Sequence, residues 1–197
     1  MKYILILAAS YLLGSIPFGL LVAKWWAKVD VREHGSGNIG MTNVLRTAGY
    51  FCAFLTLVGD MGKGVAAVLI GRHFGGDHTF TLIAGILAVV GHNWPIFLRF
   101  KGGKGVATIA GVLVAFQPLV AAVLVVIWLA VLIFSRYISL ASIVVAVCLP
   151  LALFIFKASS IEIVLATIVA GVTIFRHRSN IDRLRKGTEF RFGQKVN

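Results

Sequence analysis

The stretch GVATIAGVLVAFQPLVAAVLVVIWLAVLIF, residues 105–134, decides the fold of this chain. Read without a break, it predicts one long apolar helix. Broken at Gln117–Pro118, it predicts a short helix over 105–116 and a full-length helix over 117–134. Proline lacks a backbone N–H and disfavours helix in the residue before it, so a break here is physically reasonable. The charges elsewhere in the chain decide between the two readings.

The rest of the chain is equally apolar. Hydrophobic residues make up 59% of its 197 residues and charged residues 13%, against about 25% charge in a soluble domain. This composition, with a mean hydropathy of +0.94, excludes a disordered chain and argues against a water-soluble one. A helix needs about 20 apolar residues to cross a bilayer, and five further stretches approach that length. They are about 3–27, 50–72, 79–98, 138–156 and 159–175.

The basic residues favour seven spans. The net charge is +12, from 19 Lys and Arg against 7 Asp and Glu. Seven spans place fifteen basic residues on one side and three on the other, with Lys63 inside a span. With six spans, Arg136 and the seven basic residues of the segment 176–195 fall on the opposite side. The two sides then hold seven and eleven basic residues. Cytoplasmic loops carry the excess of Lys and Arg. We therefore expect a single all-α domain over 1–197 with seven transmembrane helices, one short (about 105–116), the N-terminus outside and the C-terminus cytoplasmic.

The same asymmetry explains the basic pI without a nucleic-acid partner, and no aromatic and basic nucleic-acid module is visible. The cysteines, Cys52 and Cys148, lie in apolar runs and give neither a disulfide pattern nor a metal-binding spacing. The three sizeable polar segments, 28–49, 99–104 and 176–197, all fall on the predicted cytoplasmic side. This distribution indicates a site that opens at the cytoplasmic face.

The first polar segment contains HGSGNIGMTNVLR, residues 34–46. Its glycines allow backbone N–H groups to approach a ligand closely. We expect Ser36 or Asn38 to cap a following helix, on which Thr42, Asn43 and Arg46 share a face. A helix N-terminus followed by an arginine is a candidate anion site. The alternative is a flexible loop with a capped helix.

The second segment is GHNWPIFLRFKGGKG, residues 91–105. Gly102, Gly103, Lys104 and Gly105 precede the predicted short helix and form a second candidate phosphate site. The pattern is not that of a Walker A loop. The alternative is a tight turn with interfacial charge. His92 ends an apolar run near the interface and is a candidate ligand-binding residue.

The third segment is RHRSNIDRLRKGTE, residues 176–189. If the last helix continues past 175, His177 and Asn180 are i,i+3 neighbours. We expect Asp182 to pair with Arg178 and Lys186. His177 and Asp182 would lie about 140° apart on a helix, so a catalytic dyad needs a break. Glu189 is expected to hold an Arg or Lys and so to fix the tail.

Three polar features fall within predicted spans. Asp60 and Lys63 are three residues apart and are interpreted as a structural ion pair, because isolated charges in a membrane are costly. Ser15-Ile16-Pro17 predicts a kink. Ser142 is a candidate for substrate contact, with an ordinary helix–helix hydrogen bond as the alternative.

Together these segments resemble the bacterial acyl-phosphate:glycerol-3-phosphate acyltransferases, the PlsY family. The matching pieces are YLLGSIPFG (11–19), SGNIGMTNVLR (36–46), GHNWPIF with FKGGKGVAT (91–108) and HRSNIDRLRKGTE (177–189). Their order and spacing match across almost the whole chain. Asp182 is not part of the family's third motif, which weakens the dyad interpretation.

The resemblance implies transfer of a fatty acyl group from long-chain acyl phosphate to the 1-hydroxyl of glycerol 3-phosphate. The products are lysophosphatidic acid and phosphate, in the first acylation of phospholipid synthesis. We expect direct transfer in the bacterial inner membrane, at a site facing the cytoplasm, because no Ser-His-Asp arrangement is visible and both cysteines lie in apolar runs. We expect no cofactor, and no metal because the acids are scattered. The expected catalytic residues are Ser36, Arg46, Lys104, His177 and Asn180. The expected substrate-binding residues are Gly37, Asn38, Thr42, Asn43, His92, Gly102, Gly103, Gly105, Ser142 and Glu189.

Two questions stay open from the residues alone. The proton of the attacking hydroxyl goes to His177 or to the leaving phosphate. The rival functions are a transporter for an anionic solute, because a short helix with a Gly-Lys-Gly start resembles a transporter half-helix, and a metal-dependent lipid phosphotransferase. The latter needs a carboxylate cluster that the seven scattered acids do not supply.

Overall fold

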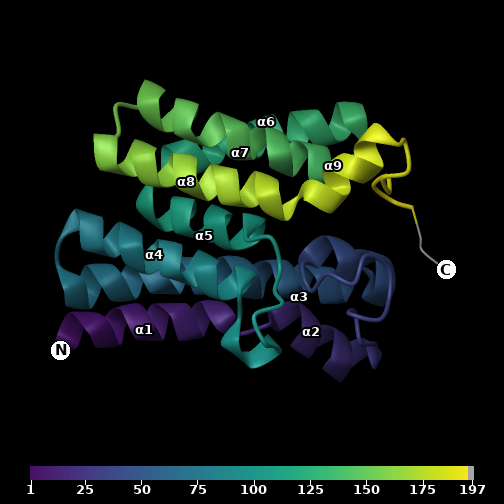
Figure 1. Cartoon of the computed structure of the whole chain (residues 1–197), viewed down its shortest axis with the longest axis horizontal. Helices are drawn as coiled ribbons and strands as arrows, with labels where there is room; N and C mark the ends of the chain where they lie inside the picture. Colours follow the sequence, from purple (N-terminus) through teal and green to yellow (C-terminus); the bar gives the residue numbers. More distant parts are fainter. Residues whose placement is uncertain (195–197) are drawn as a thin grey trace. The chain divides into compact units, whose positions relative to one another are not determined.

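The computed structural model describes residues 1–194, and the regular structure in this range is helical. The chain forms two compact units, Met1–Phe116 and the segment from Gln117 to Gln194 (Figure 1). The predicted all-α class is confirmed.

The first unit is built on four longer helices joined by shorter helical elements and loops. They are α1 (Lys2–Ser15), α3 (Met41–Ile70), α4 (His78–Asn93) and α5 (Val106–Phe116). The shorter elements are α2 (Phe18–Val22), η1 (Ala23–Ala27), η2 (Gly71–Gly75) and η3 (Ile96–Leu98). α1 packs along α4, and α5 packs along α3 (Figure 1).

Glycines allow these helices to pack closely. A Cβ atom added to Gly14 would collide with the backbone of Ala88, and one on Gly64 would collide with the carbonyl oxygen of Thr108. Membrane helices use small residues in this way because close backbone contact replaces the hydrophobic driving force that lipid does not supply.

Two breaks divide the first unit, and the sequence predicted the first of them. α1 ends at Ser15 and α2 begins after Pro17, which confirms the kink. Inside α3, Gly49 has φ 85° and ψ 178°, so the polar first turns are set off from the apolar span after residue 50.

The second unit contains α6 (Pro118–Ser135), α7 (Ile138–Ile155), α8 (Ser160–Arg176) and α9 (Arg178–Arg185). α7 packs against both α6 and α8 (Figure 1). Because α5 ends at Phe116 and α6 begins at Pro118, the predicted break at Gln117–Pro118 is confirmed. α8 starts with a capping box formed by Ser159 and Glu162, and it bends by 56° into α9 at His177.

Five helical segments are long and apolar enough to cross a membrane, and the bent pair α8–α9 makes a sixth. The five are Lys2–Ala27, Met41–Gly75, His78–Leu98, Pro118–Ser135 and Ile138–Ile155. α5, with 11 residues, spans roughly 16 Å and is too short to cross a hydrocarbon core. The count of seven and the orientation therefore stay predictions, and Lys195, one of the counted charges, lies outside the described residues.

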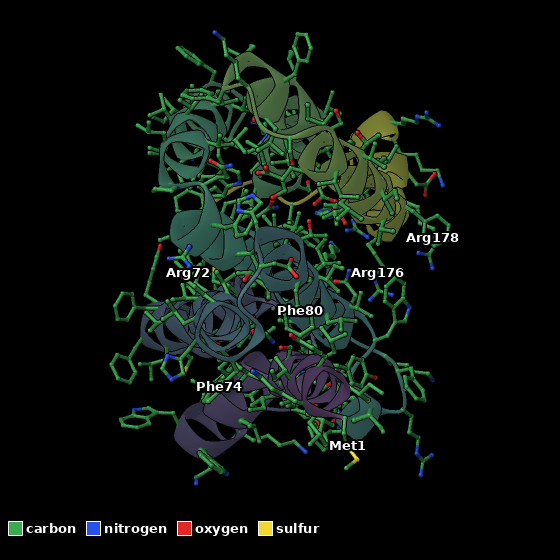
Figure 2. All side chains as sticks on the ribbon, turned by 90° about the vertical axis from the view of Figure 1, so that its left-hand side faces the viewer. Met1, Arg72, Phe74, Phe80, Arg176 and Arg178 are labelled. Atoms are coloured by element: carbon green, nitrogen blue, oxygen red, sulfur yellow. The ribbon has the colours of Figure 1, made fainter. Side chains whose placement is uncertain are left out.

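Large apolar side chains cover the outer faces of the helices (Figure 2). Ile133 is 71% and Phe134 90% exposed within this structure. Such surface is costly in water and is favourable against lipid tails.

Candidate active site

Asn43 organises the first glycine-rich loop. It is buried on the first turn of α3, where its Oδ1 accepts a hydrogen bond of 2.8 Å from the backbone N–H of Ser36. Its Nδ2 donates to the carbonyls of Val31 (2.8 Å) and His34 (3.1 Å). Gly35, with φ 61°, leaves room for this amide, because a Cβ there would collide with Oδ1. The side chain predicted to bind substrate thus holds the loop, and direct contact with substrate stays a prediction.

The predicted helix caps are wrong. α3 begins at Met41 with Gly40 as its N-cap, and that end carries no side-chain cap. Asn38 instead accepts a 2.9 Å hydrogen bond from the N–H of Gly40 in a turn before the helix. Ser36 and Gly37 are exposed on the same loop, while Thr42 and Arg46 are half-buried on α3.

A charged cluster holds the entrance to this loop. The carboxylate of Asp30 accepts hydrogen bonds from Nε (2.9 Å) and Nη2 (2.6 Å) of Arg32, and it pairs with Lys24 at 2.9 Å. The hydrogen bonds that Arg32 donates lower the pKa of Asp30 well below its usual range, and the same bonds raise the pKa of Arg32. The cluster ties η1 to the start of the loop.

The second glycine-rich loop wraps around the end of α4. The N–H of Gly103 donates a 3.0 Å hydrogen bond to the carbonyl of His92. Gly102 and Gly103 are required for this packing, because a Cβ on Gly102 would meet that carbonyl and one on Gly103 would meet Nε2 of His92. Gly105 has φ 83° and lies directly before α5. Lys104 is half-buried between these glycines.

His92 joins the ion pair predicted within the span. Nζ of Lys63 lies 2.8 Å from Oδ1 of Asp60, which confirms that pair, and 2.8 Å from Nδ1 of His92. Nζ also donates a 3.0 Å hydrogen bond to the carbonyl of Ile16, which the break before Pro17 leaves without a helical partner. The three side chains are buried, so the cluster links α1, α3 and α4 beneath the second loop.

Two buried polar atoms lie beside this loop without a hydrogen-bond partner among the described residues. They are Oδ1 of Asn93 and Oγ1 of Thr108. A Cβ on Gly105 would lie 2.9 Å from Oδ1 of Asn93. Asn93 is a polar residue that the sequence reasoning did not select, although it stands next to His92 in the quoted motif.

His177 lies at the bend between α8 and α9. It is buried, and its Nδ1 lies 2.8 Å from the carbonyl oxygen of Thr173. Because a carbonyl only accepts, Nδ1 carries the proton, and Nε2 is the basic nitrogen of the neutral ring. α8 ends at Arg176, so His177 lies between the two helices and Asn180 lies on the first turn of α9.

Glu189 anchors the tail. Its buried carboxylate accepts hydrogen bonds from Nδ2 of Asn180 (2.7 Å), Oγ of Ser139 (2.9 Å) and Nε of Arg183 (2.7 Å). The prediction that Glu189 holds a basic residue is confirmed. The hydrogen bond to Asn180 also orients that amide.

The other predicted residues of this unit have mixed outcomes. Asp182 pairs with Lys186 at 3.0 Å, as predicted, on the exposed face of α9. Its predicted contact with Arg178 is wrong, because that guanidinium lies over the ring of Phe175, 4.7 Å from its centroid. Ser142 accepts a 3.3 Å hydrogen bond from Nε1 of Trp128 and donates to the carbonyl of Ile138. Ser142 thus forms the helix–helix hydrogen bond that was the alternative to substrate contact. Contact of Ser142 with substrate stays a prediction.

Comparison with known proteins identifies the family. Residues 4–187 match the sequence model of the family described as Glycerol-3-phosphate acyltransferase. The chain belongs to this family. A relative of that name from Desulforamulus reducens is 42% identical over 98% of this chain and 96% of its own, and one from Rubrobacter xylanophilus is 47% identical over the same shares.

The family is also known in three dimensions. A crystal structure of PlsY, described as an integral membrane glycerol 3-phosphate acyltransferase in its glycerol 3-phosphate form, superposes with a TM-score of 0.92 at 40% identity. It covers 98% of this chain and 96% of its own. A second structure, of the lysophosphatidic acid form, gives 0.88 at 39% identity. The resemblance to the PlsY family is therefore confirmed, and this chain is an integral membrane member of the family.

Within this acyltransferase, sequence reasoning missed Ser139 and the link between Lys63 and His92. Ser139 stands one helical turn before Ser142, and that spacing was its only sequence signal. Lys63 and His92 are 29 residues apart, and only the packing of α3 on α4 brings them together.

Proposed function

We propose that this acyltransferase moves a fatty acyl group from long-chain acyl phosphate to the 1-hydroxyl of glycerol 3-phosphate, giving lysophosphatidic acid and phosphate. The observation that carries the proposal is a pair of glycine-rich loops, each running directly into a helix N-terminus. α3 follows the first loop and bears Arg46, and α5 follows the second loop, which bears Lys104. Both substrates are phosphates, and helix N-termini with basic side chains suit phosphate.

The second loop is assigned to glycerol 3-phosphate. Gly102, Gly103 and Gly105 give a phosphate access to backbone N–H groups, and Lys104 supplies charge. The unpartnered Oδ1 of Asn93 is an acceptor that suits a hydroxyl of glycerol. The first loop, with Ser36, Gly37, Asn38, Thr42 and Arg46, is assigned to the phosphate and carbonyl of the donor.

The transfer is proposed to be direct. The 1-hydroxyl oxygen attacks the acyl carbonyl carbon, an ester bond forms, and the bond from that carbon to the phosphate oxygen breaks. Cys52 is buried and Cys148 half-buried in apolar helices, where neither suits a nucleophile. Arg46 and Lys104 offset the charge on the reacting phosphates in a partly dry environment.

The hydroxyl proton goes to the leaving phosphate or to Nε2 of His177. The Nδ1–H of His177 donates to the carbonyl of Thr173, which leaves Nε2 as the acceptor nitrogen. The hydrogen bond from Asn180 to Glu189 fixes the orientation of the Asn180 amide on α9. We favour the phosphate as the acceptor, with His177 and Asn180 positioning glycerol 3-phosphate. Ser142 is proposed as a further contact with substrate.

The same proposal includes the membrane arrangement. The chain is one acyltransferase domain of seven transmembrane helices in the bacterial inner membrane, with α5 the short one. The N-terminus is outside and the site opens to the cytoplasm, where the excess of Lys and Arg belongs. The reaction requires no metal and no cofactor.

The decisive experiment uses the purified full-length protein in detergent with glycerol 3-phosphate and EDTA. Palmitoyl phosphate is the donor in one arm and palmitoyl-CoA in the other, and lysophosphatidic acid and phosphate are quantified. We expect equimolar products from palmitoyl phosphate alone. Product only from palmitoyl-CoA refutes the donor assignment, and product from neither, with the protein shown to be folded, refutes the proposed reaction.

A second candidate function rests on α5, a short apolar helix that starts after Gly-Lys-Gly like an anion-binding half-helix. It predicts uptake of glycerol 3-phosphate into proteoliposomes without acylation. Uptake that disappears in Lys104→Ala would support it, and acyl transfer that disappears in the same variant supports the enzyme.

A further inference from the structure

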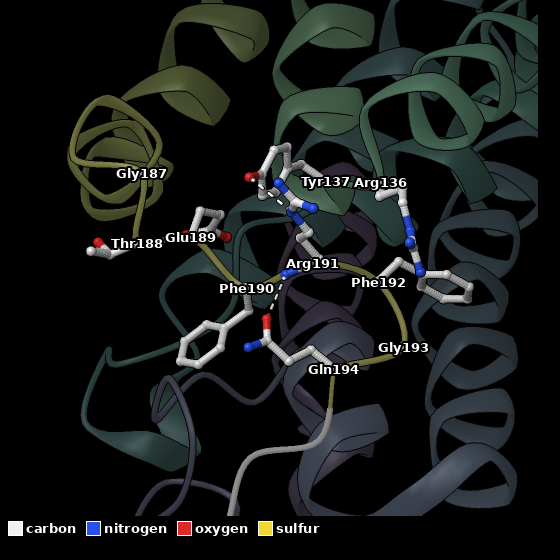
Figure 3. A pocket seen from close by; sticks show the side chains of 10 residues that line it. All are labelled: Arg136, Tyr137, Gly187, Thr188, Glu189, Phe190, Arg191, Phe192, Gly193 and Gln194. Atoms are coloured by element: carbon white, nitrogen blue, oxygen red, sulfur yellow. Dashed lines mark hydrogen bonds between the residues drawn. The ribbon is translucent and has the colours of Figure 1, made fainter.

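The second unit contains a pocket to which the proposed reaction assigns no ligand, although Glu189 lies in its wall. It has a volume of about 490 Å³ and is lined by residues 136–137, directly after α6, and by residues 187–194 of the tail (Figure 3). The tail is tied to the helix end by a 2.7 Å hydrogen bond from the N–H of Phe192 to the carbonyl of Arg136.

The pocket is positively charged. It contains the guanidinium groups of Arg136 and Arg191, and neither forms an ion pair with a carboxylate of the described residues. Arg191 instead lies over the ring of Tyr137, 5.8 Å from its centroid, with Nε 3.4 Å from the hydroxyl (Figure 3). The only acid lining the described part of the pocket is Glu189, whose carboxylate is already bound by Arg183, Asn180 and Ser139. Two cationic groups are therefore available for an anion.

Lipid-facing surface adjoins this charge. Ile133 and Phe134, in the last turn of α6, are among the most exposed apolar residues, and Phe192 exposes part of its ring beside the pocket. Aromatic and basic residues at a helix end are typical of the membrane interface. A ligand with an anionic head and an apolar tail can contact both the basic pocket and the apolar surface, whereas free phosphate can contact only the pocket.

We propose that this pocket is a binding site for the phosphate headgroup of a lipid. The phosphate lies between Arg136 and Arg191, and the acyl chain lies along Ile133 and Phe134. Arginine suits this role because its planar guanidinium can donate two hydrogen bonds to one phosphate. Basic pockets beside membrane helices recognise anionic lipids in this way. The inference does not depend on the identity of the acyl donor.

The test is native mass spectrometry of the full-length protein in detergent. The probes are phosphatidylglycerol, lysophosphatidic acid, diacylglycerol as the lipid without phosphate, and inorganic phosphate. We expect saturable binding of at least one phospholipid probe, with little binding of diacylglycerol or phosphate.

The double variant Arg136→Gln/Arg191→Gln should bind that lipid about 30-fold more weakly, because each basic residue near a lipid surface strengthens binding roughly fivefold.

A matched control removes two charges elsewhere in the same unit. Lys157→Gln/Arg185→Gln alters two exposed residues outside the pocket and should leave lipid binding unchanged. Both double variants should keep acyl transfer, which shows that they fold. Equal binding of diacylglycerol and the phospholipids, or equal losses in the two double variants, would overturn the proposal. Binding of inorganic phosphate as tight as that of the lipids would overturn the lipid assignment, and the relative affinities of the two phospholipids identify the preferred source.

Discussion

Nζ of Lys63 on α3 lies 2.8 Å from Nδ1 of His92 on α4. The same Nδ1 lies 3.4 Å from Oδ1 of Asp60, so one edge of the imidazole ring is held by both members of the ion pair. Nε2 in turn faces Gly103, where an added Cβ would meet it. The ion pair inside the span is thus connected, through one imidazole ring, to the loop assigned to glycerol 3-phosphate.

Lys63→Met should lower stability by about 3–5 kcal/mol, because it leaves Asp60 buried without its cation. The double variant Asp60→Leu/Lys63→Met removes both charges and should regain much of that stability. It should still raise KM for glycerol 3-phosphate, since His92 has lost the group that orients it. Thermal unfolding and KM measurements check both statements. A double variant with normal KM would show that the cluster is purely structural.

His177→Gln distinguishes the two proton acceptors. If Nε2 of His177 is the general base, turnover should fall about 10²-fold or more. With phosphate as the acceptor, we expect a smaller loss together with a higher KM for glycerol 3-phosphate. Steady-state kinetics with palmitoyl phosphate decide, and near-normal kcat rules out the general-base role.

Glu189→Gln should reduce kcat by at least about tenfold while the protein stays folded, because the neutral amide replaces the charge-assisted acceptor that holds Asn180 and Arg183. Asp182→Asn is the control, since it removes only the exposed ion pair with Lys186 and should change stability by less than about 0.5 kcal/mol. Activity and thermal unfolding are measured on both. If Glu189→Gln is as active as Asp182→Asn, Asn180 does not need this orientation.

The Asp30 cluster gives a pH prediction. The hydrogen bonds from Arg32 lower the pKa of Asp30 in the folded protein, so ionised Asp30 stabilises the fold fully above its unfolded pKa of about 4. This stabilisation is lost as the pH falls through the pKa that Asp30 has in the folded protein. The difference in Tm between the wild type and Asp30→Asn should be constant from pH 8 to 5 and should shrink below about pH 4. A difference that changes between pH 8 and 6 would contradict this assignment.

Several features of the molecule were accessible from the sequence because they depend on local chemistry. Pro17 and Pro118 break helices through their own missing N–H, and Asp60 and Lys63 meet because they are three residues apart on one helix. The polar motifs identified the family, because each motif is a short continuous stretch of the chain. The predicted caps at Ser36 and Asn38 are wrong, because α3 begins later and Gly40 occupies its N-cap position. The conformation of the whole loop sets where this helix begins.

The helical class and the helix breaks at Pro17 and Pro118 could thus be predicted from the sequence, and phosphate binding by the glycine-rich loops stays a prediction. The contacts between side chains on different helices depend on how the helices pack. Lys63 reaches His92 across 29 residues, and Glu189 joins Ser139 across 50, because helix packing places them together. Such pairings have no periodic signal in the chain, since the packing of α3 on α4, and of the tail on α7 and α9, sets the distances.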